Sequence, residues 1–134
     1  MTPLLDTLHA ARKLIATACV LAWAGAFTVT HIPEETASQL PGSDPSLHFI
    51  GYFAITGILW LTLLAHRITC LRRITWVLVG SIAYSTLDEL TQPLFGRSCA
   101  MSDWLSNLTA ICTVLILTEL FTLLASRKKN AEAR

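Results

Sequence analysis

Four long apolar runs, separated by short polar segments, dominate the sequence. Each run is near the ~20 residues that an α-helix, rising ~1.5 Å per residue, needs to cross ~30 Å of hydrocarbon. Because lipid offers no hydrogen-bond partner to a bare backbone, the runs predict membrane-spanning α-helices. The short alternating segments expected of a membrane β-barrel do not occur. The predicted spans are residues 14–32, 47–65, 74–92 and 104–125.

The links between these runs are short and carry residues that break helices. Residues 33–46 contain Pro41 and Gly42 and are expected to form a loop, and Pro93 and Gly96 end the third helix. Short links favour an up-down-up-down arrangement. We therefore predict one domain over residues 1–134, an all-α integral membrane four-helix bundle, with a basic tail at residues 126–134.

The composition supports this class of protein. Of the 134 residues, 53% are hydrophobic and 14% charged, and the mean hydropathy is +0.55. A soluble domain carries roughly 25% charged residues, so a soluble enzyme and a disordered tail are excluded. The net charge of +1 gives no reason to expect a nucleic-acid partner. The four cysteines are dispersed, which argues against a disulfide framework and a cysteine metal site.

The placement of basic residues predicts the orientation. Nine of the ten Lys and Arg residues lie before the first span, between spans two and three, or after the fourth. Since such residues are retained on the cytoplasmic side, both termini are predicted to be cytoplasmic, with residues 33–46 and 93–103 outside. One alternative is that Arg12-Lys13 and Ala24-Gly25-Ala26 belong to a cleaved signal peptide, which would leave three spans.

Polar side chains from three spans are expected to meet near the outer face. The fourteen residues from Ile74 to Leu87 advance only ~21 Å, so Asp88 and Glu89 lie within the hydrocarbon. A charge at that depth costs several kcal/mol unless it is paired or hydrated. Residues three or four apart share a helix face, so the other polar groups of these spans can shelter the two carboxylates. The candidate site comprises His48, Tyr52, Asp88, Glu89, Gln92, Arg97, Asp103 and Asn107.

Two segments carry a family resemblance. Asp44-Pro45-Ser46-Leu47-His48-Phe49-Ile50-Gly51-Tyr52 resembles the D-K-x-x-H-F-x-x-Y opening of the VanZ-like family. Asp88-Glu89-Leu90-Thr91-Gln92, followed by Arg97, Asp103 and Asn107, resembles its D-E-x-x-Q … R … D-x-x-x-N signature. The likeness covers residues 44–110. Pro45 replaces the family's lysine, and no glycine follows Asn107.

The resemblance implies a small multi-pass protein of the bacterial cytoplasmic membrane. The family's namesake is associated with resistance to teicoplanin, a glycopeptide antibiotic. On this basis, the expected partners are membrane lipids and a lipid headgroup or cell-wall precursor. The sequence specifies no oligomeric state, and we expect no cofactor.

Three roles for the candidate site remain open. It could be architectural, with Arg97 paired to Glu89 or Asp103. It could bind a polar headgroup, with Arg97 as the phosphate partner, although the excess of carboxylates favours a cationic group. It could be an intramembrane enzyme with Glu89 and His48 as acid and base. A metal on His48, Glu89 and Asp103 has no supporting motif, nor has a nucleophile at Ser98, Cys99 or Ser102.

Other polar residues are assigned plainer roles. Glu119, a second intramembrane acid, is expected to pair with a basic residue near the cytoplasmic side: Arg12, Lys13 or Arg67. The histidines that flank the spans are expected to be solvated: His9, His31 and His66. Trp23 and Trp60 are predicted packing residues.

Overall fold

Every element of the described chain is helical. The computed structural model describes residues 2–37 and 44–132. Its elements are α1 (Thr2–Ala10), α2 (Arg12–Thr30), α3 (Glu34–Ala37), α4 (Asp44–Ala65), α5 (Cys70–Thr91), the 3₁₀ helix η1 (Gln92–Phe95) and α6 (Met101–Glu132). The all-α prediction is therefore confirmed over these residues.

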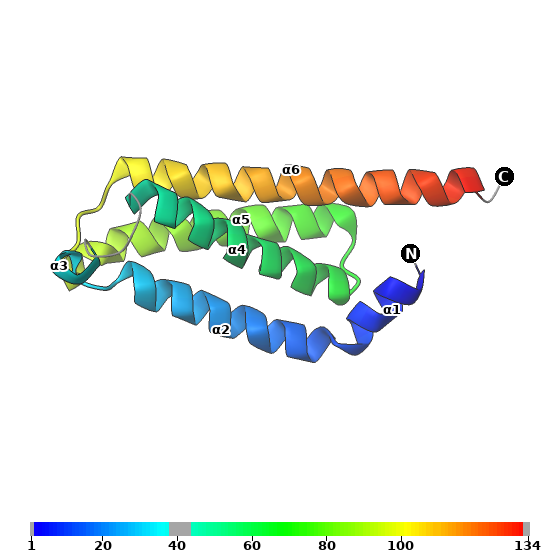
Figure 1. Ribbon diagram of the computed structural model, residues 1–134, viewed down its shortest axis with the longest axis horizontal. Helices are drawn as coiled ribbons and strands as arrows, with labels where there is room; N and C mark the ends of the chain where they lie inside the picture. The colour runs from blue at the N-terminus through cyan, green and yellow to red at the C-terminus, as the bar shows by residue number, and fades with distance from the viewer. Residues whose placement is uncertain (1, 38–43, 133–134) are drawn as a thin grey trace.

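The long helices α2, α4, α5 and α6 lie side by side along one axis (Figure 1). Helix α4 packs against each of the other three, and α5 also packs against α6. Helices α2 and α4 and the Met101–Arg127 part of α6 are long and apolar enough to cross a membrane. This confirms three of the four predicted spans as apolar helices of sufficient length. The fourth, α5, has 22 residues but carries more polar groups.

The first loop and the C-terminal tail are more helical than the sequence predicts. The predicted loop at residues 33–46 contains the short helix α3, and α4 already begins at Asp44. An acidic residue and a proline suit the first turn of a helix, which explains why Asp44 and Pro45 start α4 early. Pro41 and Gly42 lie outside the described residues. The predicted tail also continues α6 to Glu132, because Ala, Arg, Lys and Glu are good helix formers.

The third long helix ends before Pro93 and Gly96, as predicted. After α5, η1 contains Pro93 and ends at Gly96, whose φ is +76°. Glycine adopts this left-handed conformation without a steric penalty. The turn sends Arg97 back toward α5, where its backbone N–H donates to the Gln92 carbonyl at 3.3 Å.

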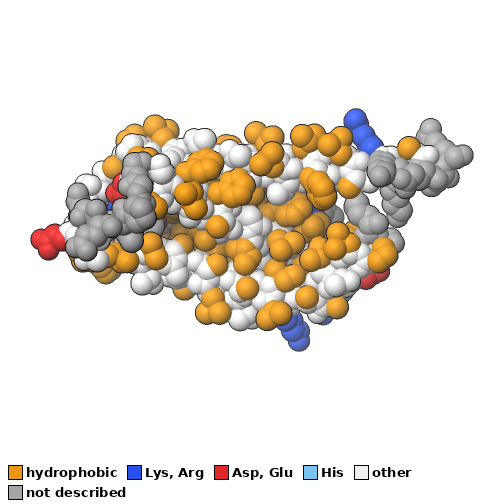
Figure 2. Space-filling view, in the orientation of Figure 1, with side chains coloured by type: hydrophobic (Ala, Val, Ile, Leu, Met, Phe, Trp, Pro, Cys, Tyr) orange, Lys and Arg blue, Asp and Glu red, His pale blue; other side chains and the backbone are white. Residues whose placement is uncertain are grey.

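The surface carries many more large apolar side chains than the surface of a soluble protein does. A small apolar core contains Tyr52, Ile55, Ala110 and Ile111. Many large apolar side chains instead point outward, among them Val20, Leu21, Ile50, Val79, Leu105 and Ile116. Figure 2 shows apolar side chains along the face in view, with charged ones toward the two ends. Contiguous exposed apolar surface of this kind marks a membrane-facing protein.

Candidate functional site

The polar residues singled out from the sequence gather at one end of the helices, where α2 ends and α4 and α6 begin. All eight are buried: His48, Tyr52, Asp88, Glu89, Gln92, Arg97, Asp103 and Asn107. We call these eight side chains the polar cluster. Helical spacing explains their convergence, since His48 and Tyr52 share one face of α4, and Asp103 and Asn107 share one face of α6.

Glu89 is the centre of one half of the cluster. Its Oε1 atom accepts hydrogen bonds from Gln92 Nε2 at 3.4 Å and from Asn107 Nδ2 at 3.5 Å. His48 Nδ1 lies 3.5 Å from the same oxygen and 3.1 Å from Asn107 Oδ1. His48 Nε2 lies 4.0 Å from Asp103 Oδ2. These contacts connect α4, α5 and α6 through polar groups.

Asp88 is the centre of the other half. Its Oδ1 atom accepts a hydrogen bond from the Thr30 hydroxyl at 2.6 Å, and its Oδ2 atom accepts one from the Tyr52 hydroxyl at 3.0 Å. His31 Nδ1 lies 3.7 Å from Oδ1. Consecutive residues on a helix point about 100° apart, so Asp88 faces α2 and α4 while Glu89 faces α4 and α6.

Arg97 pairs with a residue that the architectural alternative did not name. That alternative paired it with Glu89 or Asp103, whereas the guanidinium donates to Asp44 Oδ2 at the start of α4. The Arg97 side chain is 6% exposed, whereas that of Asp44 is 44% exposed. The turn at Gly96 aims Arg97 toward the first turn of α4.

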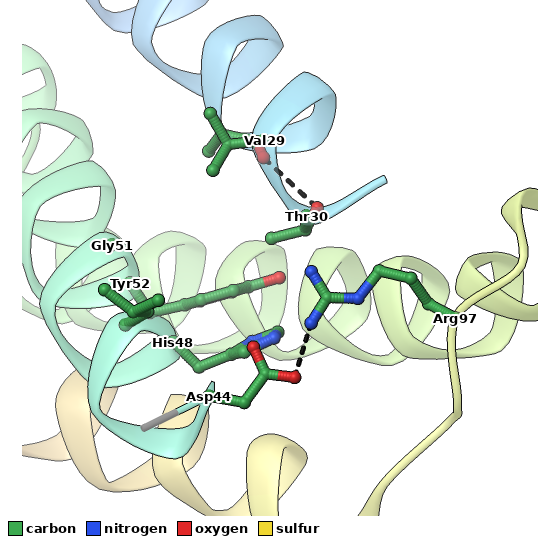
Figure 3. Close-up of a pocket in the computed structure, with 9 residues that line it drawn as sticks. Val29, Thr30, Asp44, His48, Gly51, Tyr52 and Arg97 are labelled. Atoms are coloured by element: carbon green, nitrogen blue, oxygen red, sulfur yellow. Dashed lines mark hydrogen bonds and ion pairs between the residues drawn. The ribbon is translucent and has the colours of Figure 1, made fainter. Parts of the chain in front are cut away.

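A small cavity lies beside this ion pair. It has a volume of about 80 Å³, and its polar lining comes from Thr30, Asp44, His48, Tyr52 and Arg97. Figure 3 shows Arg97 reaching across from its loop toward Asp44, with the side chains of His48 and Tyr52 pointing toward the guanidinium from the left. Of the cluster's carboxylates, Asp88, Glu89 and Asp103 do not line this cavity.

Two site residues at the end of α2 escaped sequence reasoning. Thr30 binds Asp88 directly, and His31 is buried, with its Nε2 atom 2.9 Å from the Thr91 hydroxyl and its Nδ1 atom 2.7 Å from the Phe27 carbonyl. The expectation of a solvated His31 is therefore wrong. A possible sequence signal was that Thr30 and His31 end the first apolar run at the same depth as Asp88.

A second buried group lies at the opposite end, and Glu119 is its centre. Arg73 donates to both Glu119 oxygens, from Nε at 2.8 Å and from Nη2 at 2.7 Å. Trp60 Nε1 donates to Oε1 at 2.8 Å, and the guanidinium lies 5.2 Å from the Trp60 ring centroid. The expected partners of Glu119 are therefore wrong. Arg67 instead pairs with Asp6, and Arg12 donates to the His9 carbonyl.

The chain matches no protein-family model, no curated protein and no solved structure.

The candidate nucleophiles Ser98, Cys99 and Ser102 lie in the link before α6 and in its first turn. Ser102 donates to Asp103 at 3.3 Å, and Cys99 is exposed. Among the described residues, none of the three candidate nucleophiles hydrogen-bonds to His48. Two groups of side chains have donor atoms close enough to hold a metal ion, and both include His48. One group adds Asp44 and Asp103, and the other adds Asp88 and Glu89.

Proposed function

We propose that the protein crosses the bacterial cytoplasmic membrane four times, with both termini in the cytoplasm. Helix α5 is the proposed fourth span. Its polar residues Arg73, Ser81 and Asp88 are buried, whereas its large apolar residues Val79 and Leu90 are exposed. The outward face of α5 is thus more apolar than the helix sequence as a whole.

Labelling of cysteines tests this topology. Cys99 follows η1 and Cys70 begins α5, and both thiols are exposed at opposite ends of the bundle. A membrane-impermeant maleimide added to intact cells is expected to label Cys99 and to spare Cys70 until the membrane is opened. Labelling of Cys70 in intact cells, with Cys99 spared, would show that the orientation is opposite to the proposed one.

The labelling rate of Cys70 also has a predictable pH dependence. The hydrogen bond from its thiol to Glu119 raises the pKa of Cys70. Because the thiolate is the reacting form, labelling of Cys70 after the membrane is opened should be slow near neutral pH and should speed up as the pH rises.

We further propose that the polar cluster recognises the phosphate-bearing headgroup of a lipid or of a lipid-linked cell-wall precursor. The observation that carries this proposal is the buried Arg97 guanidinium at the wall of the cavity. A planar guanidinium with donors to spare matches phosphate oxygens. The excess of carboxylates opposes phosphate binding less than the residue count suggests. Asp88 and Glu89 accept hydrogen bonds from neighbouring side chains and do not line the cavity.

The resemblance to the VanZ-like family supports a role at the cell envelope. Holding or altering a headgroup in the outer leaflet would change the access of a glycopeptide antibiotic to its target. We propose that teicoplanin susceptibility is the cellular property to measure.

Native mass spectrometry of the protein in mild detergent tests headgroup binding. The wild type is expected to retain phosphatidylglycerol or undecaprenyl phosphate, and Arg97→Gln to lose most of it because the phosphate partner is removed. Arg67→Gln is the matched control, since it breaks an exposed Arg–Asp pair at the other end of the bundle. Equal retention by both variants, with both folded, would refute the headgroup site.

An intramembrane enzyme is the second candidate function. Glu89 Oε2 and His48 Nε2 are buried and have no hydrogen-bond partner among the described residues. A carboxylate and an imidazole in one buried cluster, each with an atom that has no hydrogen-bond partner there, are groups that acid–base catalysis uses. Under this alternative, Glu89→Gln would still bind the lipid but would no longer convert it, which mass analysis of the recovered lipid would show.

A further inference from the structure

The hydrogen-bonding pattern around His48 fixes which ring nitrogen carries the proton. Its Nδ1 atom faces two acceptors, Asn107 Oδ1 at 3.1 Å and Glu89 Oε1 at 3.5 Å. The Asn107 amide is oriented by its own donation to Glu89. Nδ1 is therefore the N–H donor, and in the neutral ring Nε2 presents a lone pair.

That lone pair points toward negative charge. Asp103 Oδ2 lies 4.0 Å from His48 Nε2, which is too far for a hydrogen bond, and Asp44 is close to both. Nε2 is buried, with no hydrogen-bond partner among the described residues. A lone pair and two carboxylates facing one point repel each other unless a positive charge lies between them.

We propose that Asp44, His48 and Asp103 bind a divalent transition-metal ion such as Mn²⁺ or Zn²⁺. One imidazole nitrogen with two carboxylate oxygens is a donor set that suits these ions. The three residues come from α4 and α6, so the ion would also join the two helices at the mouth of the bundle. Nothing in the headgroup proposal requires such an ion.

The spacing of the donor atoms is close to that of a metal site. Ligands ~2.1 Å from a tetrahedral ion lie ~3.4 Å apart, so the 4.0 Å between His48 Nε2 and Asp103 Oδ2 would shorten slightly when an ion binds. Donor atoms of all three residues lie within 4.8 Å of one another. Asp44 is the residue able to close the remaining gap, because its side chain is 44% exposed at the first turn of α4. That exposure also provides a path for the ion to enter.

Charge balance supports the same ion. Arg97 donates to Oδ2 of Asp44, and Figure 3 shows the other carboxylate oxygen of Asp44 on the side of His48. Asp44, Asp88, Glu89 and Asp103 face one guanidinium, that of Arg97, so carboxylates outnumber cations at this end of the bundle. A divalent ion would offset two of the three uncompensated negative charges, and buried charge without compensation is destabilising.

Glu89 then has a positioning role. A histidine that binds a metal typically donates its other N–H to a carboxylate or carbonyl, which fixes the tautomer and makes the ligating nitrogen more basic. Glu89 and Asn107 occupy that position on the Nδ1 side of His48. The buried amides that surround Glu89 hold it there.

The ion would also serve the proposed headgroup site, and this part rests on the proposed function. His48 and Asp44 line the cavity beside Arg97, so a metal on them would put a second positive charge at the same cavity. A phosphate could then contact Arg97 and the metal together.

Titration of the purified full-length protein with Mn²⁺ tests the site directly. The protein is prepared in detergent through a tag without histidine, and free Mn²⁺ is read from its paramagnetic resonance signal. Mn²⁺ is the chosen probe because it prefers oxygen and nitrogen donors to the four free thiols. We expect one bound ion per chain, displaced by Zn²⁺.

Three substitutions locate the ion. Asp44→Asn and Asp103→Asn each remove a ligand and should weaken Mn²⁺ binding at least as strongly as Glu89→Gln, for which about 10–100-fold is expected. Asp44→Asn keeps the fold testable, since an asparagine oxygen still accepts from Arg97 on a partly exposed side chain. The matched control is Asp6→Asn, which alters the exposed Asp–Arg pair at the other end and should leave affinity unchanged.

Two results would overturn the proposal. One is wild-type binding no tighter than that of Asp44→Asn, and the other is a site that survives all three substitutions. Native mass spectrometry of the lipid complex with and without a chelator separates the two proposals. A lipid retained after chelation, beside confirmed Mn²⁺ binding, would refute only the shared use of the ion.

Discussion

Glu119→Ala is expected to lower the free energy of unfolding by about 3–5 kcal/mol, the range found when one partner of a buried ion pair is removed. The change leaves Arg73, whose side chain is 6% exposed, without its two carboxylate bonds, and it frees the Trp60 indole N–H. Thermal unfolding in detergent, followed by circular dichroism, measures the loss.

The control for this prediction is the exposed pair at the same end. Asp6 and Arg67 also form an ion pair, but their side chains are 66% and 56% exposed. Exposed pairs contribute little, so Asp6→Ala should leave the melting temperature nearly unchanged. The double variant Arg73→Met with Glu119→Leu should recover most of the stability, because it removes both buried charges. Equal melting temperatures for Glu119→Ala and Asp6→Ala would contradict the assigned role of Glu119.

The sequence predicted which side chains belong together better than it predicted their partners. Helical periodicity is a local property, so it placed His48 with Tyr52 on α4 and Asp103 with Asn107 on α6. Depth along each helix follows from the rise per residue, which is how Glu89 could be matched to residues on other spans. All eight predicted residues lie in one buried cluster.

Pairings between helices depend on rotation and register, which the sequence does not specify. Arg73 and Arg67 lie near the same end, and only the packing of α5 on α6 puts Arg73 against Glu119. Likewise, the turn at Gly96 decides that Arg97 meets Asp44. Hydropathy averaged along α5 does not register that Arg73, Ser81 and Asp88 are buried. The case for α5 as a fourth span therefore depends on the three-dimensional arrangement.

Asp88→Ala is expected to destabilise the protein by about 2–3 kcal/mol and to loosen α2. Hydrogen bonds between membrane helices average ~0.6 kcal/mol, and those to a charged group are roughly twice as strong. Asp88 accepts two of them, and its removal also leaves the buried Tyr52 hydroxyl and the half-buried Thr30 hydroxyl without that partner. The measurement is thermal unfolding, with the fluorescence of Trp23 on α2 as a local reporter.

Single substitutions of the two donors show whether Asp88 acts through them. Thr30→Val and Tyr52→Phe each remove one hydrogen bond to Asp88, and the loss of that bond should cost about 1 kcal/mol. If Asp88 stabilises the fold through these contacts, adding Asp88→Ala to the double donor variant should cost little more. A full further loss would mean that Asp88 acts through another partner, for which His31, with Nδ1 3.7 Å from its carboxylate, is the next residue to replace. Since α2 contributes Thr30 and His31 to this end of the bundle, weakening the Asp88 contacts should also reduce headgroup retention, although Arg97 is untouched.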